Sequence, residues 1–119
     1  MKEKFGIVDL FSGPGGLGEG FCVYRSDGRR QFEIDVSVEK DPVAHGTLRL
    51  RAFLRQFDGE FPPEYIDFMN NGEAEPDWAD LYPTEWALAE RETLNLTLGE
   101  KDTAATLDKR IDEVRKRRG

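Results

Sequence analysis

The fold is decided by a short stretch near the start of the chain, Phe5-Gly6-Ile7-Val8-Asp9-Leu10-Phe11-Ser12-Gly13-Pro14-Gly15-Gly16-Leu17. Its first seven residues are an apolar run rich in β-forming types, which predicts a buried parallel strand. The glycines that follow allow a tight turn and a close approach of backbone to ligand. Residues 17–24 are predicted to be a helix, whose first N–H groups and positive dipole end suit an anionic group.

A second strand is predicted over Phe32–Glu39, where apolar and polar residues alternate as in a strand covered on one face. A turn at Asp27-Gly28 precedes it. Strand, glycine turn, helix and strand make one βαβ unit, and such crossovers are almost always right-handed. Glu39 closes the second strand, where a carboxylate can accept both hydroxyl protons of a ribose. The sequence therefore predicts an adenosine-cofactor site.

The chemical type of the cofactor follows from the charge beside the glycines. Gly13 to Gly18 satisfies the G-x-G-x-x-G pattern of dinucleotide sites. An acid at the strand end, Asp9, suits an amine or a sulfonium better than a pyrophosphate. S-adenosylmethionine is therefore favoured. Two alternatives stay open: a dinucleotide-binding (NAD or FAD) fragment, and a non-catalytic interaction module whose acidic helices pair with a partner chain.

The remainder of the chain is predicted to be mainly helical. Asp41-Pro42 opens a helix by N-cap and N1 proline. A short helix is expected from Pro62-Pro63 through Met69, stopped by Asn70-Asn71-Gly72. A loop is expected over 73–80, and a helix over 85–98 ended by Gly99. A last helix is expected to be capped by Asp102. The apolar faces of the first and last of these helices are Leu50, Phe53, Leu54 and Phe57, and Ala104, Leu107, Ile111 and Val114.

No third strand is expected after Glu39, so the predicted fold class is α/β with one βαβ unit followed by a mostly helical segment. Two strands leave open edges, through which copies of the chain could associate. Residues 1–57 are interpreted as the cofactor-binding segment. Residues 58–119 are interpreted as an acidic, mainly helical insertion or the remainder of the same incomplete domain.

Charge and composition narrow the classes of partner. The net charge is −7, and residues 41–107 carry 14 acidic and 5 basic side chains, so this part should repel a phosphate backbone. One cysteine and one histidine exclude a disulfide framework and a Cys/His metal site. No apolar run approaches the roughly 18 residues of a membrane span. These features favour a reducing, cytoplasmic location without membrane or metal partners.

One family is similar over the residues just described. Asp9–Leu17 closely resembles the first signature of DNA (cytosine-5) methyltransferases, an Asp-Leu-Phe-small-Gly-x-Gly-Gly run. Val38–Asp41 resembles their second signature, and Thr47–Phe53 looks like the helix after it in bacterial members with a long insertion. The resemblance covers residues 5–57 well and the remainder loosely. It implies a partial Rossmann-like methyltransferase fold that uses S-adenosyl-L-methionine, from a bacterial modification or restriction-modification system.

The resemblance also implies roles for single residues. Phe11 would pack its ring against the adenine, Glu39 would hold the ribose hydroxyls, and Lys40 would flank the adenine with its aliphatic stem. The methionine end of the cofactor would meet the backbone of a loop whose members are Gly13, Pro14, Gly15, Gly16 and Leu17.

The nucleophile of the family is not found in this chain. In the family a cysteine of a Pro-Cys pair attacks C6 of a flipped cytosine in DNA, and C5 takes the methyl group. The one cysteine, Cys22, follows Phe21 and is expected to be a small buried thiol. His45 is expected to have a capping or surface role. We therefore expect a fragment that is inactive alone, with DNA bound through a missing C-terminal part.

Overall fold

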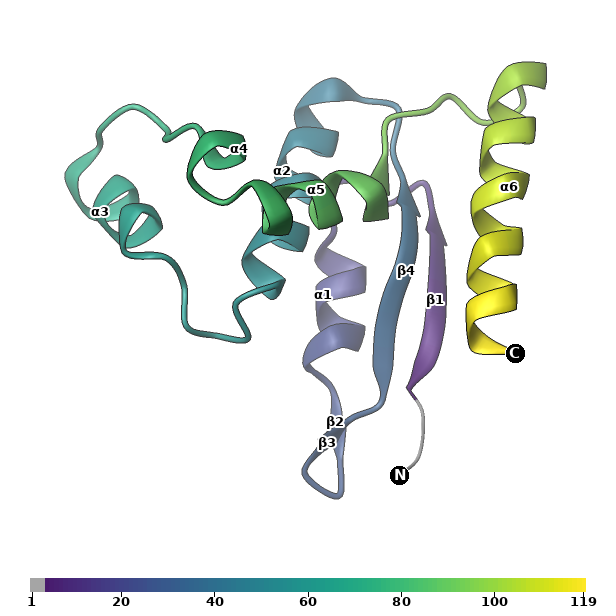
Figure 1. The fold of residues 1–119 in the computed structure, drawn as a ribbon, viewed down its shortest axis with the longest axis horizontal. Helices are drawn as coiled ribbons and strands as arrows, with labels where there is room; N and C mark the ends of the chain where they lie inside the picture. The colour runs from purple at the N-terminus through teal and green to yellow at the C-terminus, as the bar shows by residue number, and fades with distance from the viewer. Residues whose placement is uncertain (1–3) are drawn as a thin grey trace.

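The computed structural model describes residues 4–119 and has a mixed α/β architecture (Figure 1). Three parallel strands form one sheet in the order β1-β4-β5, and β2 and β3 form a small antiparallel hairpin. The strands are β1 (Phe5–Leu10), β2 (Arg25–Ser26), β3 (Arg29–Arg30), β4 (Phe32–Val38) and β5 (Thr93–Leu94). The helices are α1 (Gly16–Val23), α2 (Pro42–Arg55), α3 (Pro63–Asn71), α4 (Trp78–Leu81), α5 (Pro83–Glu92) and α6 (Lys101–Arg118).

The predicted βαβ unit is present, but the prediction that its first strand is buried was wrong: β1 lies at the edge of the sheet, and Phe5, Val8 and Leu10 are exposed. β1 pairs in parallel with β4, and α1 connects them. Helix and strand approach closely because Gly18 has no side chain: a Cβ there would lie 2.7 Å from Cδ1 of Ile34. The hairpin between α1 and β4 turns at Asp27 and Gly28, which both have positive φ (54° and 74°), as tight two-residue hairpin turns require.

The sheet has a third strand, so the prediction of none after Glu39 was wrong. β5 pairs in parallel with the end of β4, with Thr93 opposite Ser37 and Leu94 opposite Val38. The helix expected to reach Leu98 ends at Glu92. A strand of two residues is too short to show alternation in the sequence. The order β5-β4-β1 is the 3-2-1 order of the first half of a doubly wound sheet.

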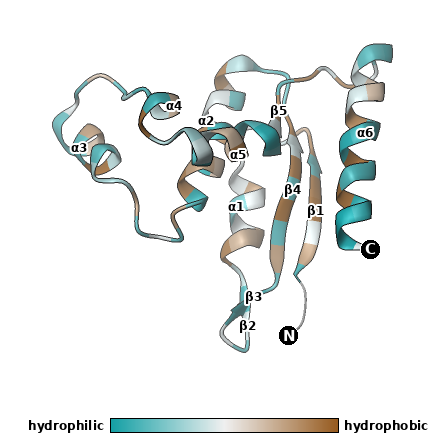
Figure 2. Cartoon of the chain, in the orientation of Figure 1, coloured by the Kyte–Doolittle hydropathy of each residue, from teal (hydrophilic) through white to brown (hydrophobic). Residues whose placement is uncertain are grey.

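β4 is buried on both faces instead of one because helices cover both sides of the sheet, and a β-bulge determines which face each of its side chains occupies. The register shifts between Ile7 and Val8, which pair with Ile34 and Val36, so Asp35 is the extra residue. Before the bulge, Ile34 lies against α1. After it, Val36 and Val38 form a core with Leu107 and Val114 of α6. Figure 2 shows this strand as one of the more hydrophobic parts of the molecule.

Helix α6 lies on the opposite side of the sheet from α1, α2 and α5 (Figure 1). Its buried positions are Thr103, Leu107 and Val114, whereas Ala104 of the predicted face is exposed. The expected cap was also wrong: the N-cap is Glu100, without a side-chain cap bond, and Asp102 lies in the first turn. A negative charge in the first turn still favours the helix through its dipole.

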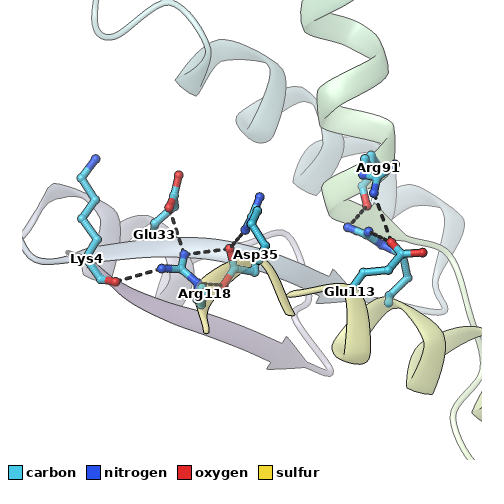
Figure 3. A network of polar contacts seen from close by, with 8 residues as sticks. Lys4, Glu33, Asp35, Arg91, Glu113 and Arg118 are labelled. Carbon is cyan, nitrogen blue, oxygen red and sulfur yellow. Dashed lines mark hydrogen bonds and ion pairs between the residues drawn. The ribbon is translucent and has the colours of Figure 1, made fainter. Parts of the chain in front are cut away.

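The last turn of α6 is held to the sheet by ion pairs (Figure 3). The carboxylate of Asp35, 1% exposed, accepts from Nε of Arg118 at 2.6 Å and also pairs with Arg117. Arg118 further donates to Glu33 at 2.9 Å and to the carbonyl oxygen of Lys4 at 2.9 Å. The bulge therefore leaves a buried charge, which the basic helix end neutralises.

A second core joins α2, α4 and α5. Ala52, Phe53, Trp78 and Ala89 are buried there, and the predicted apolar face of α2 packs into it. Helix α4 lies partly within residues predicted to be a loop, because Asp77 caps it and Trp78 reaches this core. By contrast, α3 contains no buried residue. None of the helices in the described part of the chain is long and apolar enough to cross a membrane.

Candidate cofactor site

The glycine loop connects β1 to α1 and is tied to the end of β4. The N–H of Ser12 donates to the carbonyl oxygen of Val38 at 2.9 Å, and its hydroxyl donates to the carbonyl oxygen of Asp9 at 2.7 Å. Gly13 and Gly15 have φ of 58° and 95°, in the left-handed region that favours glycine. The loop therefore lies at the carboxyl ends of two parallel strands, where open α/β sheets bind ligands.

The two sides of this loop differ. A Cβ on Gly15 would lie 2.9 Å from Cδ1 of Leu48, so the loop packs against α2 at this residue. A Cβ on Gly13 or Gly16 would have no neighbour within 4 Å. Pro14 and Leu17 are exposed. Of the five loop residues expected at the methionine end of the cofactor, Gly13, Pro14, Gly16 and Leu17 form the open side, whereas Gly15 is buried against α2.

Phe11 is not a core residue. Its side chain is 77% exposed, and its φ of 59° is unusual for a bulky residue. Such a conformation costs on the order of 1–3 kcal/mol and is concentrated at ligand sites. The structure therefore leaves the ring available at the mouth of β1, where the resemblance places it.

The carboxylate of Glu39 connects the glycine loop to the start of α2. Its Oε1 accepts from the N–H of Gly13 at 3.0 Å, and its Oε2 accepts from the N–H of Asp41 at 2.8 Å. The two residues that the sequence selected from separate signatures, Gly13 and Glu39, are therefore in direct contact. Each carboxylate oxygen can accept two hydrogen bonds, so each can still accept one from a ribose hydroxyl.

Asn95 is the residue of this site that the sequence did not identify. Its Nδ2 donates to the carbonyl oxygens of Glu39 and Lys40 at 2.9 and 3.0 Å. No signal in the sequence pointed to it, because residues 85–98 were assigned to a helix and the short strand Thr93–Leu94 before it was not expected. Lys40 itself has an exposed side chain.

Asp9 contributes a negative charge close to α1. Its Oδ2 lies 3.6 Å from the position that a Cβ on Gly18 would occupy. A carboxylate at this place opposes the binding of a pyrophosphate at the start of the helix and attracts a cationic group.

Cys22 is buried, as expected, and borders an ion cluster that the sequence could not show. Arg55, at the end of α2, pairs with Glu19 of α1 and Glu92 of α5. Burial raises the pKa of the Cys22 thiol and also that of the Glu92 carboxyl, with the Arg55 charge opposing the shift in both. A thiol with a raised pKa is a poor nucleophile at neutral pH.

His45 connects α2 to β5, since its Nε2 lies 3.0 Å from the carbonyl oxygen of Thr93. Across residues 4–119 no group of three or more His, Cys, Asp or Glu side chains is arranged to hold a metal ion.

Comparison with protein-family models, curated proteins and solved structures found no match to this chain.

Proposed function

We propose that this chain is the S-adenosylmethionine-binding segment of a DNA (cytosine-5) methyltransferase. The observation that carries the proposal is the 3.0 Å hydrogen bond from the N–H of Gly13 to the carboxylate of Glu39. It joins the two signatures that the family resemblance rests on, at the edge of the sheet where ligands bind.

The residues of the site fit the parts of the cofactor. Glu39 has acceptor capacity left for the two ribose hydroxyls. The exposed ring of Phe11 is available to the adenine, and the open side of the loop at Gly13 and Gly16 leaves room for the methionine end. When bound, the cofactor would supply the methyl group on its sulfonium. The role of this chain is to bind and orient it.

The charge of Asp9 supports this cofactor over a dinucleotide. Its carboxylate lies beside α1, next to the helix start that a dinucleotide would use for its pyrophosphate. Placing two like charges there would cost binding free energy, whereas the amine and the sulfonium of S-adenosylmethionine are attracted to it.

Methyl transfer itself needs a nucleophile that these residues do not provide. Cys22 is buried and follows Phe21, so it matches neither the Pro-Cys pair nor an accessible thiolate. Under the proposal, a Pro-Cys segment and the DNA-binding surface belong to polypeptide outside residues 1–119. The free edge of β1, with Val8 and Leu10 exposed, offers a surface on which such a segment can pack.

The proposal is tested by calorimetric titration with S-adenosylhomocysteine, the product form of the cofactor. Phe11→Ala and Glu39→Ala should each raise Kd, Glu39→Ala by roughly 10- to 100-fold because hydrogen bonds to a charged group are lost. Phe61→Ala and Glu60→Ala, an exposed aromatic and an acid outside the site, are matched controls and should bind as the wild type does. Unchanged Kd in both site variants would refute the assigned roles.

A further inference from the structure

We propose that Asn95 is a positioning residue of this site, because its side-chain amide fixes the turn at Glu39 and Lys40 and thereby directs the Glu39 carboxylate toward the glycine loop. The part of this inference that concerns ligand binding rests on the proposed function. The part that concerns the ligand-free protein does not.

Leu94 and Asn95, at the end of β5, are hydrogen-bonded to Glu39 and Lys40, which follow β4. The carbonyl oxygen of Leu94 accepts from the N–H of Glu39 at 3.0 Å, which extends the parallel pairing by one bond. The next residue, Asn95, then donates to the carbonyl oxygens of Glu39 and Lys40 at 2.9 and 3.0 Å. A side-chain amide has two N–H donors, and this geometry uses both of them.

Both the backbone and the side chain of Glu39 are therefore held by hydrogen bonds. Its N–H and C=O are bound by residues 94 and 95, and its two carboxylate oxygens are bound by Gly13 and Asp41. The turn from Glu39 to Asp41 has no regular secondary structure that could hold it instead. Removal of the Asn95 amide frees the backbone end of this arrangement, so the carboxylate end loses its fixed direction.

Asn95 contributes little else to the packing of the fold. Its side chain is exposed and belongs to neither hydrophobic core. Substitution at such an exposed position normally changes global stability little. An effect on the glycine loop can therefore be separated from general destabilisation of the fold.

The first experiment needs no ligand. Amide hydrogen exchange and chemical shifts of Gly13 and Asp41 are measured by NMR in the wild type, Asn95→Leu, Asn95→Asp and Glu39→Gln, with Asn70→Leu as an exposed control. Both Asn95 variants should shift these two amides and speed the exchange of Gly13 by about fivefold, in the direction that Glu39→Gln does. If Glu39→Gln perturbs the two amides and both Asn95 variants leave them unchanged, the positioning role is overturned.

The second experiment separates this role from a merely structural one. Binding of S-adenosylhomocysteine is compared with binding of its 2′-deoxy analogue, which lacks one of the two ribose hydroxyls. Asn95→Leu should weaken the first ligand about five- to tenfold and the second much less, because the effect passes through Glu39. Equal weakening of both ligands would contradict the inference. If the wild type binds neither ligand, the proposed function of this chain fails, and the amide measurement alone decides the role of Asn95.

Discussion

Gly15 shows how one residue sets the shape of the site. It is buried, its φ is 95°, and it packs against Leu48 of α2. Only glycine adopts this conformation without strain while leaving room for the leucine. The sequence identified the loop. It could not show which of its glycines has no room for a side chain, because the contact comes from α2, which is distant in the chain.

Gly15→Ala should therefore lower the free energy of unfolding by about 1–2 kcal/mol, from left-handed strain and the contact with Leu48. Gly20→Ala is the matched control, because it lies in α1 with open space around its Cβ position. It should raise stability by roughly 0.5–1 kcal/mol through helix propensity. Urea unfolding measures both variants, and a Gly15→Ala variant as stable as Gly20→Ala would contradict the packing described.

Glu92 makes stability depend on pH. Burial raises its pKa above the ordinary value of 4.5, so the folded state retains the proton at pH values where the unfolded state has released it. Its contribution to stability therefore falls as pH rises from that value through the raised pKa. Glu92→Gln removes this dependence.

The unfolding free energy of Glu92→Gln minus that of the wild type should consequently increase as the pH rises above 4.5. Glu90→Gln, at an exposed position on the same helix, is the matched control for the substitution itself. Urea denaturation over a series of pH values tests this, and a difference for Glu92→Gln that falls with pH would contradict the assignment.

At the scale of elements, local signals predicted β1, α1, β4 and α2 because each has a pattern in its own residues. β5 and the bulge had no such signal. Thr93-Leu94 forms a strand only because β4 offers it an edge, and Asp35 becomes the extra residue only because β1 sets the register. Asn95 was missed for the same reason, since its function depends on where β5 ends.

The docking of α6 through Asp35 gives a further test. Arg118→Met should lower the unfolding free energy by about 2–3 kcal/mol, because it leaves a buried carboxylate with only Arg117 as partner. Arg115→Met removes an exposed pair with Asp112 at 3.9 Å and should cost less than about 0.5 kcal/mol. The double variant Asp35→Asn/Arg118→Met should lose less unfolding free energy than Arg118→Met alone, because the buried carboxylate is no longer present. Equal effects of the two single arginine substitutions in urea unfolding would show that the ion cluster does not hold the helix.

At the scale of the molecule, charge is separated in space. Residues 56–90 contain ten acidic and no basic side chains, and the α3–α4 region lies on the opposite side of the molecule from α6 (Figure 1). Residues 56–90, here called the acidic lobe, would repel a phosphate backbone. Under the proposed function, DNA approaches from elsewhere, and the open sheet edge at β1 lies well away from this lobe.

The binding of an adenosylmethionine-type ligand is tested most directly by thermal unfolding of the 119-residue chain with S-adenosylhomocysteine, beside the same measurement with NAD. At 100 times Kd, a bound ligand adds about 2.7 kcal/mol, which raises Tm by several degrees. We expect this rise with S-adenosylhomocysteine alone. No rise with S-adenosylhomocysteine, or an equal or larger rise with NAD, would contradict the proposal that these residues form an S-adenosylmethionine site.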